Sequence, residues 1–468
     1  MTYWLVRAKW DQDDKINEFV HNNEWINGYD GEKFFNEVNS IQKDDFLILA
    51  DGSYIRYFAK CTQNYNDGTY IKVDKWIEIK PFYLSGKGAY IKTISKIRDT
   101  KIIQSIDGII SNAMGRIDHF KISALEIENF TVFKKANLKF SQGLNVFIGE
   151  NASGKSHLLK LIYAIIKTNN DVSMNHSFDE TSCQRKAAQN LTNVFCVEKV
   201  GNLVHKSKRD VKEANIKLDF SEYTLKFVFR PKSEVEVAIK ALPEKMFEKK
   251  AVFIPTKEML SIFPGFTLLY RRREIEFDET YYDLCSSLEL PLLKNIQSYP
   301  EKYDMIKSLE EILKGKIKIE NGRFYLETEE KGSLEITIIA EGIRKIAMLS
   351  YLVSNDSLDK DSILFWDEPE SNLNPRLIKQ IARTLLKLSS HGVQLFIATH
   401  SLFLLKEIEI LKTKQSNIKY FSLSMQDDFV EVIQGNSIED IDEVVSLDEE
   451  LEQSERFMDK ELYSEANE

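Results

Sequence analysis

Residues 144–167 read LNVFIGENASGKSHLLKLIYAIIK, and this stretch decides the fold. Its centre, Gly149–Ser156, matches the pattern GxxxxGK[ST], in which backbone N–H groups and a lysine surround phosphate and a hydroxyl binds magnesium. The apolar run before the loop is typical of a buried strand, and the run after it is typical of a helix. We therefore expect the loop at a helix N-terminus, where free amides and the helix dipole favour an anion.

Two apolar runs far downstream end in polar side chains. The run ILFWDE, residues 363–368, delivers two adjacent carboxylates, and the run VQLFIATHS, residues 393–401, ends in His400 and a serine. Both have the composition of parallel strands buried on both faces. We expect Asp367 to hold magnesium together with Ser156, and Glu368 to polarise an attacking water. His400 could reach the γ-phosphate region and hold the same water.

These segments, with SNLNP at 371–375 between them, resemble the ATP-binding-cassette (ABC) ATPases. The resemblance is to the soluble branch that contains the structural-maintenance-of-chromosomes (SMC), RecF and overcoming-lysogenization-defect (OLD) proteins, and it covers about 119–165 and 335–415. It implies an α/β P-loop NTPase with an ABC-type ATPase head, a mixed sheet flanked by helices. It also implies ATP and Mg²⁺ as cofactors, slow regulated hydrolysis with Glu368 and His400 as catalytic residues, and a homodimer or higher homo-oligomer formed through the ATPase heads.

The expected contacts to the nucleotide come mostly from the phosphate loop. They are Gly149, Asn151, Ala152, Ser153, Gly154, Lys155, Ser156 and His157, with Gly342 from a second segment. Gly342 lies in IAEGIRK, residues 339–345, where the resemblance implies a signature motif; relatives usually carry LSGGQ, and the serine is missing here. A glycine at a helix start can still present amides to a γ-phosphate, and Arg344 or Lys345 could add charge.

Two further features of the family have only weak counterparts in this sequence. No convincing Q-loop is present; Gln184 and Gln189 lie in the right range, but a polar surface role suits both. Phe130 and Phe133 precede the phosphate loop, where they could stack on adenine or fill the core of a hairpin.

The first 85 residues differ in character, because they are rich in aromatic residues and in strand-like runs such as YWLVRA and YIRYFAKC. We expect a small β-barrel that resembles the PUA and EVE group, whose members bind RNA or modified DNA bases. Trp4, Trp10, Trp25 and Trp76 could stack on a flipped base or could fill the core of the barrel. DNA or RNA with a modified base is therefore a candidate partner of residues 1–85.

Composition and charge define the remaining boundaries. We expect a connector helix over 86–118, an ATPase domain over 119–435 with an inserted α+β segment at 168–335, and an acidic tail over 436–468. This tail holds thirteen acidic and two basic residues, which leaves the rest of the chain nearly neutral. No apolar run approaches the roughly 18 residues of a membrane span, and the N-terminus does not resemble a signal peptide, so we expect a cytoplasmic protein with no membrane partner.

The sequence supports more than one biological role. A regulatory ATPase that senses foreign or modified nucleic acid and controls a separate effector, such as a nuclease in bacterial anti-phage defence, is the leading hypothesis. It is favoured because neither a Toprim acidic cluster nor a nuclease carboxylate-lysine pattern follows His400. A RecF-like repair or clamp ATPase and an assembly protein that binds no nucleic acid are the alternatives.

Overall fold

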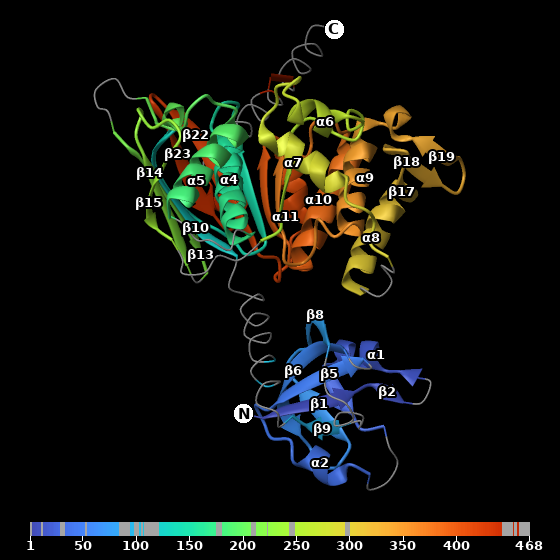
Figure 1. The fold of residues 1–468 in the computed structure, drawn as a ribbon. Coiled ribbons are helices and arrows are strands. Elements are labelled where there is room, and N and C mark those ends of the chain that lie inside the picture. The colour runs from blue at the N-terminus through green and yellow to red at the C-terminus, as the bar shows by residue number, and fades with distance from the viewer. Residues whose placement is uncertain are drawn as a thin grey trace. The chain divides into compact units, whose positions relative to one another are not determined.

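The computed structural model divides into two compact units, Met1–His119 and Phe120–Glu468, and we describe each by itself (Figure 1). The structure describes residues 2–10, 13–28, 33–51, 54–83, 94–97, 103, 106, 121–174, 180–206, 212–221, 223–242, 249–294, 300–441, 453, 456 and 457. Most of the expected connector helix and most of the acidic tail lie outside these residues. Within the expected connector, Ile94–Lys96 is a strand that pairs with the first strand of the chain, so this part belongs to a sheet.

The first unit is built on a seven-stranded mixed sheet in the order β4-β7-β6-β5-β1-β9, with β8 paired to β6. Its larger strands are β1 (Tyr3–Arg7), β5 (Phe46–Asp51), β6 (Tyr54–Asn64), β7 (Tyr70–Val73) and β8 (Ile77–Tyr83). The shorter elements are β2 (Lys9–Trp10), β3 (Asp13–Asp14), α1 (Ile16–Asn22), β4 (Glu24–Ile26), α2 (Phe35–Asn39) and β9 (Ile94–Lys96). Among the described residues β4 and β9, at the two ends of this order, do not pair with each other, so pairing does not close the expected barrel.

Three of the four tryptophans considered for base stacking or for the barrel core lie in the core of this unit. Trp4, Trp25 and Trp76 are each less than 5% exposed. Each indole N–H is also satisfied within the chain, because it donates to the Asp45 carboxylate, to the Arg7 carbonyl and to the Glu24 carbonyl respectively. These three side chains stabilise the unit and offer no open face to a flipped base. Of the two roles that the sequence allowed, they fill the core.

The second unit contains a central six-stranded sheet in the order β16-β20-β21-β12-β22-β23. Neighbouring strands are parallel except for β23, which runs antiparallel to β22. The strands are β12 (Leu144–Gly149), β16 (Ala251–Ile254), β20 (Ile363–Asp367), β21 (Gln394–Thr399), β22 (Ile418–Gln426) and β23 (Phe429–Gly435). Since the parallel strands all end at one edge, the residues that follow β12, β16, β20 and β21 come together there.

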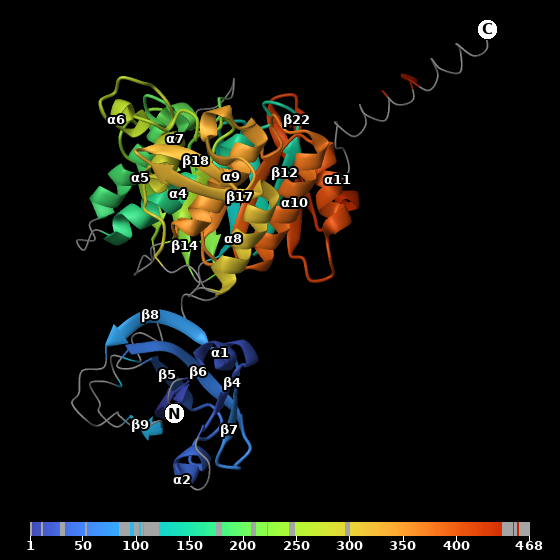
Figure 2. The same ribbon diagram turned by 90° about the vertical axis from the view of Figure 1, so that its right-hand side faces the viewer.

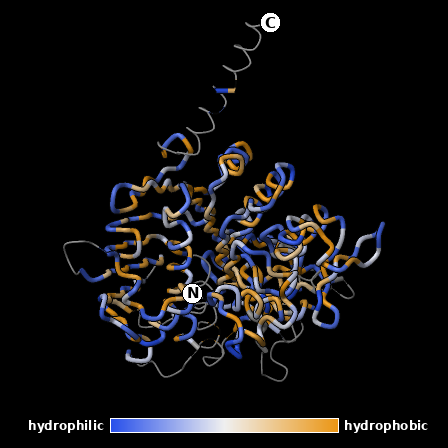
Figure 3. The backbone as a smooth tube through the Cα atoms, turned by 90° about the horizontal axis from the view of Figure 1, so that it is seen from above, coloured by the Kyte–Doolittle hydropathy of each residue, from blue (hydrophilic) through white to orange (hydrophobic). Residues whose placement is uncertain are grey.

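A five-stranded antiparallel sheet packs beside the central sheet, in the order β11-β10-β13-β14-β15. It consists of β10 (Ile122–Phe130), β11 (Phe133–Lys139), β13 (Ala214–Phe220), β14 (Thr224–Phe229) and β15 (Ala238–Ala241). Hydrophobic and polar residues alternate along β13, as expected for a strand with one buried face, and Figure 3 displays such alternation along the backbone.

The stretch 168–335, expected as an inserted segment, contributes strands to both sheets, because β13–β15 complete the antiparallel sheet and β16 forms an edge of the central sheet. The sequence signal was ambiguous there, since short apolar runs do not reveal which sheet they join. The remainder of 168–335 forms α5 (Glu180–Phe195), η1 (Val200–Leu203), α6 (Phe266–Arg271), α7 (Glu279–Leu288), α8 (Pro300–Leu313) and a small sheet of β17 (Gly315–Glu320), β18 (Arg323–Thr328) and β19 (Gly332–Glu335).

Helices cover both faces of the central sheet (Figures 1 and 2). On one face Phe147, Phe365 and Phe396 pack with α4 (Lys155–Met174), α5 and the antiparallel sheet. On the other face Leu364 and Trp366 pack with α9 (Glu341–Ser354), α10 (Pro375–Ser390), α11 (Leu402–Leu411) and α7. The short turns η3 (Ile336–Ile338) and η4 (Ile438–Asp440) complete the unit. This arrangement, a largely parallel sheet with helices on both faces, is an α/β P-loop NTPase fold.

Among the described residues, no helix is both long enough and apolar enough to cross a membrane.

Candidate nucleotide-binding and hydrolysis site

The phosphate loop joins β12 to α4 at the carboxyl edge of the central sheet, as the sequence predicted. Ala152 and Gly154 have positive φ angles of 65° and 89°, which turn the backbone sharply before the helix begins. Lys155 is 6% exposed, and its ammonium donates to the carbonyls of Gly149 (2.9 Å) and Glu150 (2.7 Å). The loop therefore curls around a buried cation. Burial lowers the pKa of Lys155, against the opposing charge of nearby carboxylates led by Glu368.

The turn between β10 and β11 packs closely behind the loop. A Cβ atom at Gly154 would lie 2.7 Å from the Val132 side chain and 2.8 Å from the Phe133 ring, so only glycine fits at this position. Phe133 and Phe130 are fully buried, and Phe130 packs edge-on against Phe195. Neither ring is available to adenine. Both phenylalanines belong to the core, which was the second of the two possibilities in the sequence.

His157 follows the loop on the first turn of α4. Its ring lies 5.7 Å from the ring of Phe195, and burial lowers the pKa of its imidazole. The atom Nδ1 is buried and has no hydrogen-bond partner within the chain.

The strand β20 carries Asp367 and Glu368 to the same edge, two strands away from the phosphate loop. Asp367 is 7% exposed, and its Oδ1 atom is buried without a hydrogen-bond partner. Burial raises the pKa of Asp367, while a hydrogen bond from Ser156 lowers it. A hydroxyl and a carboxylate are ordinary magnesium ligands, and an unpartnered buried carboxylate oxygen is what a cation would satisfy. Ser156 and Asp367 thus fit the expected metal.

Glu368 has an uncommon backbone conformation for a non-glycine residue, with φ of 49°. Its N–H donates to the Ala398 carbonyl of the neighbouring strand at 2.8 Å. Its carboxylate lies 3.5 Å from Nδ1 of His400, whose side chain is half exposed. The structure therefore brings the two expected catalytic residues together at the solvent-facing side of the edge.

Glu370 is a site residue that the sequence analysis missed. It is 6% exposed, and its Oε1 accepts from the hydroxyl of Thr399 (2.5 Å) and from the N–H of His400 (3.2 Å). The other carboxylate oxygen, Oε2, is buried without a partner. Glu370 holds the end of β21 against the turn after β20. The sequence feature that could have identified Glu370 is its position, since it is an acidic residue two positions after Glu368.

The loop after β16 also reaches this edge, beside Asp367. The hydroxyl of Thr256 lies 3.5 Å from Oδ2 of Asp367, and Glu258 is 7% exposed. The run AVFI followed by Pro255 and Thr256 had the pattern of another buried parallel strand and could have identified this loop.

Gln184 and Gln189, considered above for a Q-loop, lie instead on α5, where Gln189 is exposed.

The segment around Gly342 forms the start of α9, and it is engaged within its own chain. A Cβ atom at Gly342 would lie 2.3 Å from Leu373, so this glycine permits close packing on the SNLNP segment. Arg344 donates to Glu258 at 2.7 Å, and Lys345 donates to Ser371. Arg344 and Lys345, which the sequence offered as possible sources of charge for a γ-phosphate, are both paired within the chain.

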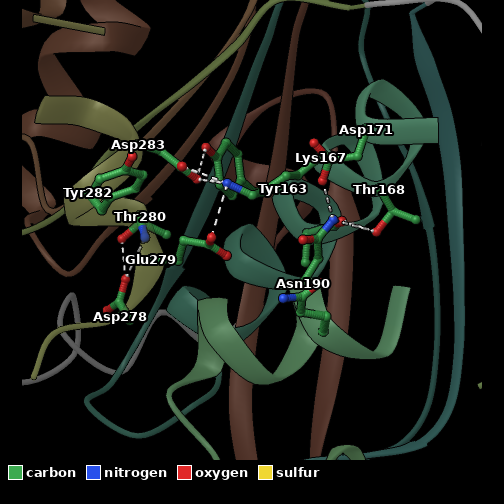
Figure 4. A network of polar contacts seen from close by, with 12 residues as sticks. Tyr163, Lys167, Thr168, Asp171, Asn190, Asp278, Glu279, Thr280, Tyr282 and Asp283 are labelled. Carbon is green, nitrogen blue, oxygen red and sulfur yellow. Dashed lines mark hydrogen bonds and ion pairs between the residues drawn. The ribbon is translucent and has the colours of Figure 1, made fainter. Parts of the chain in front are cut away.

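Helix α4 is anchored away from the loop by a polar network with α7 (Figure 4). Lys160 pairs with Asp278 at 2.8 Å, and the ammonium of Lys167 lies 2.6 Å from the Asp283 carboxylate, which also accepts from the Tyr163 hydroxyl at 2.8 Å. These contacts fix the helix whose N-terminus forms the phosphate loop.

Two family models match this part of the chain. One, described as "AAA ATPase domain", matches residues 120–261, and the other, described as "AAA domain, putative AbiEii toxin, Type IV TA system", matches residues 202–406. Together with the loop, the strand carboxylates and the sheet order, these matches decide the class. The chain carries an ATP-hydrolysing domain.

Similarity to individual proteins is local or distant. The chain is 40% identical over 47 residues to the DNA replication and repair protein RecF of Streptococcus suis, which covers 10% of this chain and 13% of that protein. The chain spans less than a fifth of the length of such curated relatives. Among solved structures, an SMC head bound to the C-winged helix domain of ScpA has a TM-score of 0.45 at 15% identity, covering 68% of this chain and 99% of that one. The SMC head domain from Thermotoga maritima has a TM-score of 0.40 at 14% identity, with the same coverage.

Proposed function

We propose that the carboxyl edge of the central sheet binds ATP with magnesium and hydrolyses it through the residues described above. Ser156 and Asp367 would hold the metal, and Lys155 would pair with the β- and γ-phosphate oxygens. When bound, magnesium offsets the negative charge of the phosphates. The observation that carries this assignment is the unpartnered, buried Oδ1 of Asp367 at the same edge as a buried lysine.

The residues of this chain divide the remaining tasks. Lys155 would exchange its bonds to the Gly149 and Glu150 carbonyls for phosphate oxygens. Glu368 would accept a hydrogen bond from the attacking water and orient it, since its carboxylate lies at the open side of the edge. His400, 3.5 Å from that carboxylate, would donate to the water or to the γ-phosphate. Glu370 would keep the His400 backbone in place.

The physiological role that we propose is regulation: the ATPase cycle controls a separate effector protein in an anti-phage defence system. The match to a family model whose description names a putative toxin of a toxin-antitoxin system supports this proposal. We further propose that the ATPase heads form a homodimer or higher homo-oligomer, in which the start of α9 faces the nucleotide of the other subunit. Residues 1–85 would carry the PUA/EVE-like sensor unit for DNA or RNA.

A RecF-like role in DNA repair is the second candidate, favoured by the local identity to RecF proteins. The two roles differ in how they respond to ordinary DNA. A RecF-like protein should bind unmodified duplex in the presence of ATP, and the duplex should raise its ATPase rate. A regulator of an effector should show no such response.

A phage challenge tests the regulatory role directly. Host cells would carry the chain with its chromosomal neighbours, either as the wild type or as Lys155→Ala, and plaques would be counted. We expect protection that Lys155→Ala removes, and an ATPase rate that unmodified duplex leaves unchanged. Equal plaque counts with and without the locus, together with duplex-stimulated ATPase activity, would favour the repair role instead.

A further inference from the structure

A buried lysine on α9 reaches the turn that carries Glu368. Lys345 is 1% exposed, and its ammonium donates to the carbonyl (2.8 Å) and the hydroxyl (2.6 Å) of Ser371. Lys345 is remote from Ser371 in sequence, so this contact joins two separate elements of the fold. Burying an ammonium group costs free energy even when it has two hydrogen-bond acceptors. We therefore interpret the contact as one that fixes the geometry of the turn.

Ser371 passes this contact on to Glu368. Its hydroxyl donates to the Glu368 carbonyl at 2.9 Å, and its N–H donates to the same carbonyl at 3.1 Å. Glu368 itself holds a left-handed backbone conformation, with φ of 49°, which persists only where the surroundings impose it. The other side of this turn is fixed by Glu370, which accepts from Thr399 and His400. Lys345 supplies the restraint from the α9 side.

Other residues in the first turn of α9 also contact the segment 371–373. Glu341 accepts from the Asn372 side chain at 3.0 Å, and Gly342 packs directly on Leu373. The first turn of α9 and residues 371–373 therefore form one contact surface, so a displacement of α9 is transmitted to the turn that carries Glu368.

We propose that Lys345 is a positioning residue for ATP hydrolysis, which acts through Ser371 to hold the Glu368 carboxylate in its working orientation. The proposal rests on the proposed function, because it takes Glu368 as the group that orients water. Lys345 does not touch the nucleotide in this account. Its removal should slow the chemical step while ATP still binds, since misplacing a catalytic group by about 1 Å can cost about 100-fold in rate.

The groups around Lys345 favour a protonated ammonium that holds Ser371 in place. Desolvation lowers the pKa of its ammonium, while the carboxylates of Glu341, Glu370, Glu368 and Glu258 favour the protonated form. These four groups lie on α9, on the turn after β20 and on the loop after β16, which are the three elements that meet at this point. A methionine has a similar length but donates no hydrogen bond, so it removes the tether at little cost in volume.

The experiment compares Lys345→Met and Ser371→Ala with the wild-type chain in steady-state ATPase assays and in ATP-binding titrations. We expect kcat to fall by about 10- to 100-fold in Lys345→Met and by a smaller factor in Ser371→Ala, with the ATP dissociation constant within about threefold of wild type. The double variant should be no slower than Lys345→Met alone, because both changes cut the same connection.

Lys249→Met is the matched control. Lys249 is another buried lysine, 9% exposed, at the opposite edge of the same sheet, so its loss should leave kcat unchanged. Wild-type kcat in folded Lys345→Met would overturn the proposal. If Lys345→Met fails to fold, Ser371→Ala decides, and an unchanged kcat there would overturn it as well. Full activity of Glu368→Gln would instead refute the proposed function, which keeps the two failures distinguishable.

Discussion

The two edges of the central sheet are made by the same strands, yet they differ in whether buried polar groups have hydrogen-bond partners within the chain. At the amino edge, Gln394 is 1% exposed, and its amide bonds to both backbone groups of Ile122 and to the Ser141 carbonyl. At the carboxyl edge, buried oxygens of Ser153, Asp367 and Glu370 have no partner within the chain. Polar groups that serve the fold are paired internally, whereas groups left unpaired at one edge indicate where a ligand completes the structure.

The largest effect should come from the phosphate loop. Lys155→Ala removes the cation around which the loop is built, and we expect ATP binding to weaken by about 100-fold or more, equivalent to about 3 kcal/mol. Isothermal titration with ATP and magnesium measures this change. Lys217→Ala is the control, because Lys217 lies on β13 of the antiparallel sheet and pairs there with Glu126 and Asp219. Equal ATP affinity in Lys155→Ala and wild type would contradict the claim that the carboxyl edge, unlike the amino edge, binds a ligand.

A glutamine at the amino edge should affect stability and not function. Gln394→Ala leaves the backbone groups of Ile122 buried and unpaired, so we expect the free energy of unfolding to fall by about 3 kcal/mol. Urea denaturation measures this, and ATP affinity should stay unchanged.

The control for Gln394 is Gln434→Ala. Gln434 also bridges two backbone groups, those of Lys139 and Asn137, but at exposed positions where water can replace it. Its loss should cost less than about 1 kcal/mol. Equal losses for the two glutamines would mean that burial at the amino edge does not set the cost.

The pH dependence of stability sharpens the comparison further. Burial lowers the pKa of Lys249 at the amino edge to about 8, from an ordinary value near 10.5. Between these two values the unfolded chain binds this proton more tightly than the folded chain, so the contribution of Lys249 to stability rises with pH, by at most about 1.4 kcal/mol per pH unit.

Comparison of Lys249→Met with wild type isolates this contribution from other titrating groups. The variant should exceed wild type in stability most clearly below pH 8, and its advantage should shrink toward pH 10.5. Thermal or urea unfolding across this range provides the measurement. A difference that does not vary with pH would show that Lys249 is not desolvated as described.

Local patterns were sufficient for part of this account. The phosphate loop, the strand before Glu368 and the strand before His400 each combine a motif with an apolar run, so the sequence alone predicted these strands and the candidate site at their ends. The sequence could not show that β13–β16 join two different sheets, because strand partners are set by contacts between distant residues. It could not show that Lys345 points to Ser371, since the direction of a helical side chain depends on what packs against the helix.

Substitution of Glu368 by glutamine tests the central claim most directly. Glu368→Gln keeps the size of the side chain but removes the carboxylate charge to which we assign the orientation of water. The account predicts that this variant binds ATP as tightly as wild type, hydrolyses it at least about 100-fold more slowly and accumulates in the ATP-bound state. ATP affinity and single-turnover hydrolysis, measured on the same preparation, give the answer. A hydrolysis rate equal to that of wild type would contradict the account.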